Sequence, residues 1–373
     1  MLECRTSNAL NVSSEVQVIT LLAATGYTGQ LVAAELHRRK LKFRMAARSK
    51  EKLVQLAEAL GGSIEIAVID INDDESLASG LNDTHVLINC AGPFTDLGEP
   101  VVAKAARRGI HYIDTTGEQN FIKLVYDRYS AEAEKNGVAL VPAAAYDYAF
   151  GDAGAEIVSR GLEPCDEISV VYFVSGFNTS RGTKKSMLRV ASQPCFLYRD
   201  GAVVEVKSGD LKRDVELPGG RKLVGVSFPG GEVLQTPPHV ATRNVITFMA
   251  VSQTIAGVLG AAGAVNKVVK KGTSDAIIDR LYRDNPGPDE AHRLATEFVV
   301  VCEARKENQS RTLFITGCDP YGITAVSVVA LAERLLRDEP QHVGAVAPSM
   351  LFGADFIRDY TTAAGLKWTF KES

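Results

Sequence analysis

The sequence predicts an α/β protein in which a doubly wound parallel sheet is followed by a second α+β domain with a mainly antiparallel sheet. Two observations indicate this division. From residue 16 to about 142, short apolar runs alternate with stretches of helical periodicity, the order typical of strand–helix–strand units in a parallel sheet. After residue 150, runs of alternating polarity follow one another and are joined by turn signals such as Asp200-Gly201, as in antiparallel hairpins.

The elements of the first part follow from these runs. Strands are expected within 16–22, 42–47, 64–70, 84–92, 110–116 and 138–145, and helices at 28–38, up to 60, at 75–80 and at 99–108. In the second part, strands are expected within 166–177, 196–206, 222–228, 296–306 and 311–317, and helices at about 183–192, 243–270 and 322–337. The stretch 343–360 is interpreted as a helix that returns to the first domain. The predicted domains are 1–145, 146–340 and 341–373.

Composition limits the partners. The chain has 373 residues, 46% hydrophobic residues and a formal net charge of −4, so it offers no basic field for nucleic acid. No apolar stretch reaches the roughly 18 residues of a membrane span, and the first 14 residues lack a secretory apolar region. The six cysteines show no metal-ligand spacing. A cytoplasmic protein without a bound metal is therefore expected, and a homodimer is left open.

The stretch "LLAATGYTGQ", residues 21–30, stands where the first strand gives way to a helix. Gly26 and Gly29 allow close backbone approach, as in a dinucleotide-binding turn, while a plain tight turn is the alternative. Ala23 takes the place of the first glycine, so a turn with ordinary φ is expected there. The predicted cofactor contacts of this turn are Ala24, Thr25, Gly26, Tyr27 and Thr28.

The end of the second strand predicts which dinucleotide binds. Arg48 and Ser49 stand there, with Lys52 nearby and without an acidic residue to bind a free ribose 2′-hydroxyl. A guanidinium suits a 2′-phosphate, which favours NADP over NAD; a solvated basic helix start is the alternative. Further cofactor contacts are expected at the ends of the third and fourth strands, at Asp70, Cys90, Ala91, Gly92 and Pro93.

The segment "AAYDYAFGD" begins where the parallel sheet ends, and domain junctions hold small-molecule sites. Tyr146, Asp147 and Tyr148 are the candidate catalytic residues. The alternative, favoured for Asp147, is that it caps a helix beginning near Gly151 and that the tyrosines are packed with satisfied hydroxyls. The predicted substrate contacts are Thr116 and Glu118, after the fifth strand, and Thr183 and Lys184 at a helix start; Lys184 as a surface charge is equally open.

Several of these motifs together resemble the saccharopine dehydrogenase-like reductases, and especially their trans-acting enoyl reductases. The block "NCAGPFTDLGEPVVAKAARRGIHYIDTTGE" is the most specific, and "ATGYTG", "AARSKEKL", "SRGTKKSML" and "VGAVAPSMLFGADF" are also similar. The resemblance implies a Rossmann domain, a substrate-binding domain and NADP(H) as hydride source. Tyr148 and Phe150 stand where that family tends to carry Ser and Pro.

Three functions remain open from the sequence. The first is an NADPH-dependent reductase of the C=C bond of an acyl or polyketide-type substrate, which could be thioester- or carrier-linked. The second is an imine or amino-acid-conjugate reductase, which would need clustered arginines for substrate carboxylates; Arg181, Arg189 and Arg199 are available. The third is a binding protein that senses NADP without catalysis.

Overall fold

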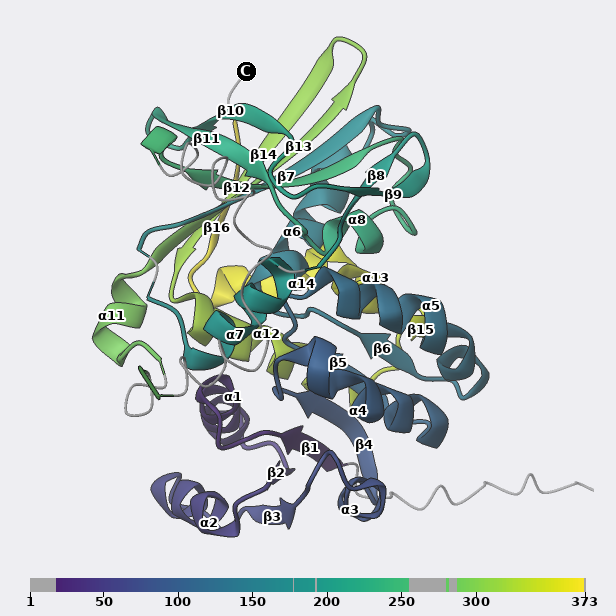
Figure 1. Ribbon diagram of the computed structural model, residues 1–373, viewed down its shortest axis with the longest axis vertical. Coiled ribbons are helices and arrows are strands. Elements are labelled where there is room, and N and C mark those ends of the chain that lie inside the picture. Colours follow the sequence, from purple (N-terminus) through teal and green to yellow (C-terminus); the bar gives the residue numbers. More distant parts are fainter. Residues whose placement is uncertain (1–17, 177, 192, 255–279, 282–286, 372–373) are drawn as a thin grey trace, which may run out of the picture.

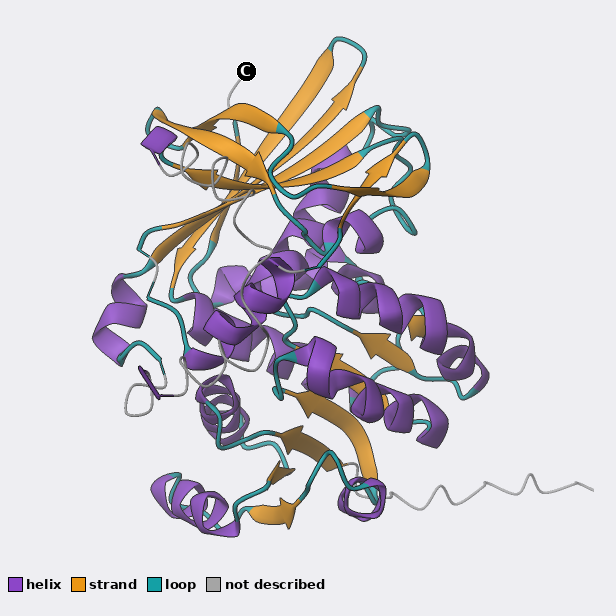
Figure 2. Cartoon of the chain, viewed as in Figure 1, coloured by secondary structure: helices purple, strands orange, loops and turns teal. Residues whose placement is uncertain are grey.

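Figure 1 shows the computed structural model, in which residues 18–176, 178–191, 193–254, 280–281 and 287–371 are described. Two sheets form its frame, and helices lie between them (Figure 2). No helix of the described ranges is both long and apolar enough to cross a membrane.

The first sheet has seven parallel strands in the order β15-β6-β5-β4-β1-β2-β3. They are β1 (Val18–Leu22), β2 (Phe43–Ala47), β3 (Glu65–Val68), β4 (Thr84–Asn89), β5 (His111–Asp114), β6 (Ala139–Val141) and β15 (Gly344–Ala345). One face packs against α1 (Tyr27–Arg38), α2 (Lys50–Ala59) and α12 (Pro320–Leu335), and the other against α3 (Asp74–Gly80), α4 (Phe94–Arg108) and α5 (Gln119–Lys135). This is the doubly wound sheet that the alternating pattern predicts.

The second sheet is mixed and has nine strands, with the main order β10-β11-β12-β7-β13-β14-β16. They are β7 (Glu167–Val174), β8 (Cys195–Arg199), β9 (Ala202–Val206), β10 (Lys212–Leu217), β11 (Arg221–Ser227), β12 (Val245–Val251), β13 (Glu297–Lys306), β14 (Gln309–Cys318) and β16 (Lys367–Phe370). All pairs are antiparallel except β7 with β12. The predicted fold class is therefore confirmed.

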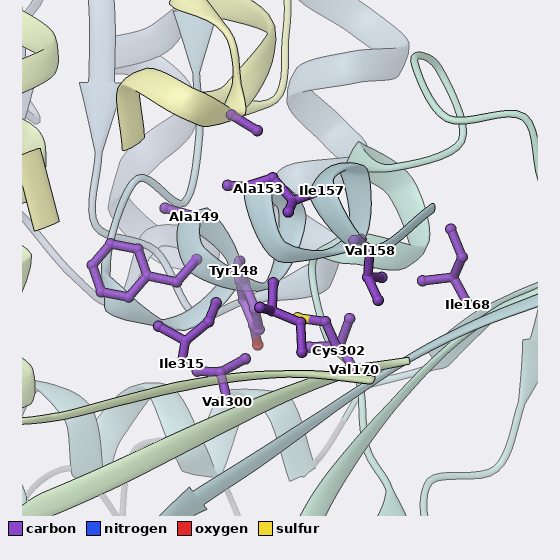
Figure 3. Close-up of a cluster of buried hydrophobic side chains, with 14 of the residues drawn as sticks. Tyr148, Ala149, Ala153, Ile157, Val158, Ile168, Val170, Val300, Cys302 and Ile315 are labelled. Atoms are coloured by element: carbon purple, nitrogen blue, oxygen red, sulfur yellow. The ribbon is translucent and has the colours of Figure 1, made fainter. Parts of the chain in front are cut away.

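Helix α6 (Tyr146–Ser159) follows β6 and packs on the second sheet. Figure 3 shows its side chains Ala153 and Ile157 above residues of that sheet such as Val300 and Cys302. The approach is close at Gly154, where a Cβ would lie 2.4 Å from the Cys302 Sγ. The remaining described helices are α7 (Arg181–Ala191), α8 (Glu232–Gln235), α11 (Glu290–Ala295), α13 (Pro348–Phe352) and α14 (Ala354–Ala363).

Helix α12 is expected beside the antiparallel sheet, but it covers the first sheet. Val328 and Leu331 of α12 lie in one buried cluster with Val32 and Leu36 of α1. Apolar residues occur around most of α12, so their spacing does not indicate which sheet the helix covers.

Two other expectations are wrong. The helix expected at 243–270 contains β12 instead, because a short, continuous apolar run fits a buried strand as well as a helix; residues 255–270 lie outside the described residues. A single closing helix is expected at 343–360, but this stretch forms β15, α13 and α14. Gly353, with φ 88°, separates α13 from α14. Residues after 340 thus contribute β15 to the first sheet and β16 to the second. The domain limits at residues 145 and 340 remain a prediction.

Candidate functional site

The carboxyl ends of the first sheet hold the predicted cofactor residues. Strand β1 lies between β2 and β4. The chain adds β2 and β3 on one side of β1 and then β4, β5 and β6 on its other side, so the direction of strand addition reverses at β1. In open α/β sheets, ligands bind in the crevice at such a switch point.

The turn after β1 differs from the expectation for Ala23. Its φ is 59°, so alanine occupies the left-handed region that was expected to need glycine. That conformation costs an alanine about 1–2 kcal/mol. Hydrogen bonds hold the turn, with Gly26 N donating to Ala23 O at 2.9 Å and Ala24 N donating to Ala46 O at 3.1 Å.

The glycines of this turn allow α1 to begin close to the strand. A Cβ on Gly29 would lie 2.2 Å from the Ala23 carbonyl oxygen, and one on Gly26 would lie 3.2 Å from it. Gly26 is the N-cap, and the first turn of α1 has no acidic residue. The first amides of a helix lack intrahelical acceptors, so those of α1 suit an anion such as a pyrophosphate.

The side chain of Tyr27 is engaged elsewhere in the protein. Its hydroxyl donates to Pro288 O at 2.7 Å, and its ring meets Tyr321 edge-on with 4.9 Å between the ring centroids. Burial raises the pKa of Tyr27 to about 12. The Tyr27 hydroxyl is therefore already used within the protein, and its backbone amide lies at the start of α1.

The residues at the end of β2 agree in part with each of the two alternatives, a 2′-phosphate site and a solvated basic start of a helix. Arg48 is exposed and makes no ion pair with another described residue, whereas Ser49 caps α2 by accepting from Lys52 N at 3.3 Å. The Ser49 hydroxyl also donates to Glu51 at 2.9 Å. After β3, Asp70 is exposed and accepts hydrogen bonds from Asn72. An exposed guanidinium thus stands at the end of β2, and its contact with a 2′-phosphate remains a prediction.

The loop after β4 contains Cys90, Ala91, Gly92 and Pro93, and Asn89, which the sequence analysis did not single out, shapes it. The Asn89 side chain accepts from Ala91 N at 2.9 Å and donates to the Tyr112 hydroxyl at 3.1 Å. Burial raises the pKa of the Cys90 thiol to about 12. The thiol is therefore protonated at neutral pH and is no nucleophile.

The predicted substrate residues after β5 are bonded within the protein. Asp114 accepts from the backbone amides of Thr116 and Ala143, both at 2.9 Å, and Thr116 Oγ1 accepts from Glu118 N at 3.1 Å. Glu118 is buried and accepts from the amides of Phe94 and Thr95, both at 2.9 Å. Residues 114–118 thus connect the end of β5 to the loop after β6 and to the start of α4.

At the junction, Tyr148 has φ 70° and is buried. Its amide donates to the Tyr172 hydroxyl at 2.8 Å, and its own hydroxyl lies 3.2 Å from each of two acceptors, the carbonyl oxygens of Gly117 and Pro229. Tyr148 thus matches the alternative of a packed tyrosine with a satisfied hydroxyl.

Asp147 and Tyr146 differ from Tyr148. Asp147 makes no side-chain capping bond, so the favoured interpretation of Asp147 as a helix cap is wrong. Its carboxylate has no ion pair and no hydrogen bond to another described residue, and burial raises its pKa to about 7. The Tyr146 hydroxyl likewise has no recorded hydrogen bond within the described part of the chain, and burial raises its pKa well above the usual value. A Cβ on Gly117 would lie 3.5 Å from Asp147 Oδ2, which places this carboxylate beside the loop after β5.

Helix α7 carries the other two predicted substrate residues. Thr183 Oγ1 lies 2.9 Å from the Tyr321 hydroxyl, and the Lys184 ammonium donates to the Thr179 carbonyl oxygen. Burial lowers the pKa of Lys184. The structure therefore brings α7 to the start of α12.

This edge defines the class of protein, one that binds a dinucleotide on a Rossmann sheet. The family model described as the saccharopine dehydrogenase NADP binding domain matches residues 19–141. These residues are thus an NADP-binding domain of the saccharopine dehydrogenase type, and NADP is its cofactor.

Relatives and a solved structure agree with this assignment. A saccharopine dehydrogenase-like oxidoreductase of Bos taurus is 28% identical over 193 residues, which cover 47% of this chain and 42% of that protein. A Mycobacterium tuberculosis protein whose name proposes a trans-acting enoyl reductase is 34% identical over 188 residues, covering 47% and 44%. The chain thus spans less than half the length of these relatives.

The structure of yeast saccharopine dehydrogenase (L-Glu forming) superposes with a TM-score of 0.62, at 14% identity, over 95% of this chain and 100% of that one. The two chains share the fold. The resemblance to the saccharopine dehydrogenase-like oxidoreductases is confirmed.

Proposed function

We propose that the chain is an NADPH-dependent oxidoreductase that reduces the C=C bond of an enoyl substrate, carried as a thioester or on a carrier. The observation that carries this proposal is the Asp147 carboxyl, which is unpaired among the described residues, has a pKa near neutrality and lies at the cofactor edge of the first sheet. A general acid works best when its pKa lies near the working pH.

Held by the turn after β1 and by Arg48, NADPH would supply the hydride that adds to the β-carbon of the enoyl group. Protonated Asp147 donates a proton to the α-carbon, which completes the addition of two hydrogens across the double bond. Burial raises the pKa of Tyr146, which favours the neutral phenol, and this phenol can donate a hydrogen bond to the carbonyl oxygen as enolate charge develops. These roles for Asp147 and Tyr146 follow from their lack of partners within the described ranges.

A second candidate is the reduction of an imine, because an unpaired Asp147 carboxylate would also attract a cationic iminium. Of the three arginines considered for the carboxylates of such a substrate, Arg181 and Arg189 lie on α7 and Arg199 does not. Arg189 is buried and pairs with Asp96 at 2.8 Å, and Arg199 lies at the end of β8. This observation favours the enoyl substrate.

A panel of enoyl thioesters, ketones and imines, tested for NADPH consumption, separates these functions. The proposal expects turnover with enoyl thioesters. Turnover of imines alone would support the second candidate, and tight NADPH binding without any turnover would indicate a sensor.

Tyr146→Phe and Tyr148→Phe form a matched pair for the same assay. If the Tyr146 phenol stabilises the enolate, the removal of its hydroxyl should lower turnover by about 10²-fold. Tyr148→Phe should lower thermal stability instead, since it removes hydrogen bonds to buried carbonyls. Full turnover of Tyr146→Phe would reject its assigned role.

A further inference from the structure

Glu118 joins three elements that are far apart in the sequence. Its Oε1 accepts from Phe94 N at 2.9 Å and from Ser186 Oγ at 2.7 Å. Its Oε2 accepts from Thr95 N at 2.9 Å and from Thr95 Oγ1 at 2.5 Å. Four donors use the acceptor positions of the two oxygens, so Glu118 has none left for a substrate.

The two backbone contacts of Glu118 fix the start of α4. The amides of Phe94 and Thr95 are the first of this helix, where a negative charge is favoured by the helix dipole. Helix α4 begins directly after the loop 90–93, so the carboxylate also fixes the end of that loop. The anion-binding position at the N-terminus of α4 is therefore occupied by the Glu118 carboxylate of the protein itself.

The other contact brings in α7. Ser186 lies near the middle of α7, and a Cβ on Gly92 would be 3.7 Å from its hydroxyl oxygen. The helix is also held toward its ends, by Thr183 to Tyr321 at 2.9 Å and by Arg189 to Asp96 at 2.8 Å. Helix α7 thus crosses the loop that would hold the nicotinamide ribose.

We propose that Glu118 and Ser186 are positioning residues, which set the distance between α7 and the loop 90–93 around the nicotinamide end of the cofactor. The inference rests on the proposed function for its kinetic part. Because the pair does not touch the pyrophosphate turn or Arg48, it should govern the alignment of the reacting atoms and leave most of the cofactor affinity unchanged.

Two variants test this pair. Ser186→Ala removes the hydrogen bond between Glu118 and α7 but keeps the bonds from Glu118 to α4. Glu118→Gln replaces one acceptor oxygen of Glu118 by an amide NH2 group, which would face other donors. Glu99→Gln is the matched control, since Glu99 is another carboxylate that links α4 to α5, but it lies on α4 and bonds to Arg128 and Tyr129 of α5. Should Glu118→Gln fail to fold, Ser186→Ala alone decides the outcome.

The first measurement compares the Kd for NADPH with kcat on the substrate found in the panel. A misplacement of reacting groups by about 1 Å costs about 10²-fold in rate. Ser186→Ala should therefore lose about 10²-fold in kcat while the NADPH Kd stays within about twofold, and Glu99→Gln should change neither. Unchanged kcat in Ser186→Ala, or an equal loss in NADPH affinity, would overturn the proposal.

The second measurement needs no substrate. Hydrogen exchange of the α7 amides should slow when NADP⁺ binds to the wild type, and this protection should be lost in Ser186→Ala. If NADP⁺ leaves α7 exchange unchanged in the wild type, the positioning role is wrong. If protection depends on Ser186 but no substrate is reduced, the proposed function fails and the link between α7 and the cofactor loop stands.

Discussion

Two strand-to-helix turns at the same edge of the first sheet share a backbone feature and differ in chemistry. Ala23 follows β1 with φ 59°, and Ala143 follows β6 with φ 61°. Both alanines precede a helix, α1 in the first case and α6 in the second. The first turn offers glycines and the first amides of α1, whereas the second offers the carboxyl of Asp147 and the phenol of Tyr146.

The difference shows that one edge of the sheet can use backbone amides at one turn and functional side chains at another. A turn that uses backbone amides depends on the absence of side chains, so it should fail when a Cβ is added. A turn that uses side chains depends on one or two functional groups, so it should fail when a group is exchanged at constant shape. Each of the following substitutions probes one side of this contrast.

The largest effect is expected for Asp147→Asn. A lost general acid costs about 10²–10⁴-fold in turnover, while NADPH affinity should stay unchanged. The dependence of turnover on pH also tests this role. The acid must be protonated, and the pKa of Asp147 is raised to about 7, so wild-type turnover should fall as the pH rises above 7. The variant should lack this limb of the profile; a limb that persists would assign it to another group.

Next comes Gly29→Ala in the first turn. The added Cβ would lie 2.2 Å from the Ala23 carbonyl oxygen, so α1 must shift. Overpacking costs about 1–3 kcal/mol, which corresponds to a loss of up to about 10²-fold in NADPH affinity if the shift displaces the amides. Fluorescence titration with NADPH measures this. Gly26→Ala, with 3.2 Å to the same oxygen, should lose less; equal losses would show that steric contact with Ala23 does not decide binding.

Arg48→Ala should weaken NADPH binding by about one to two orders of magnitude, as expected for the loss of a hydrogen bond between charged groups. NADH binding should hardly change, which makes NADH the internal control. The effect should also decrease with added salt, because Arg48 is exposed. If the wild type bound NADH and NADPH equally, Arg48 would not read the 2′-phosphate.

The smallest effects are expected for Ala23→Gly and Ala143→Gly. Each relieves a left-handed alanine, which offsets the backbone entropy that glycine loses on folding, so the free energy of unfolding should change by less than about 1 kcal/mol. Ala34→Gly, on the exposed side of α1, is the control and should destabilise by about 1 kcal/mol. Losses at Ala23 or Ala143 as large as at Ala34 would argue against the shared backbone feature.

The sequence predicts the two sheets well because each has its own periodicity. Parallel strands such as β1 appear as short apolar runs, and hairpins such as β8–β9 are marked by an Asp-Gly turn. It does not predict that α12 packs on the first sheet or that 245–251 is a strand, since an apolar segment does not specify its partner.

For the site, the sequence finds the right segments but not the state of each group. Motif position alone cannot tell that Glu118 is saturated by donors from α4 and α7, or that Asp147 lacks a partner in the described chain. These facts depend on contacts between residues far apart in sequence. The left-handed conformation of Ala23 is not predicted, because the φ preference of a single residue does not include the hydrogen bonds that hold the turn.

The placement of α12 and β15 has a consequence for synthesis on the ribosome. Most of the first sheet emerges early, but the helix that covers its apolar face beside α1, and the strand β15, emerge only after strands β7 to β14 of the second sheet. Until then, residues such as Val32 and Val86 lack part of their cover. The nascent cofactor domain should therefore depend on chaperones until α12 and β15 are made, and a fragment ending at residue 145 should aggregate.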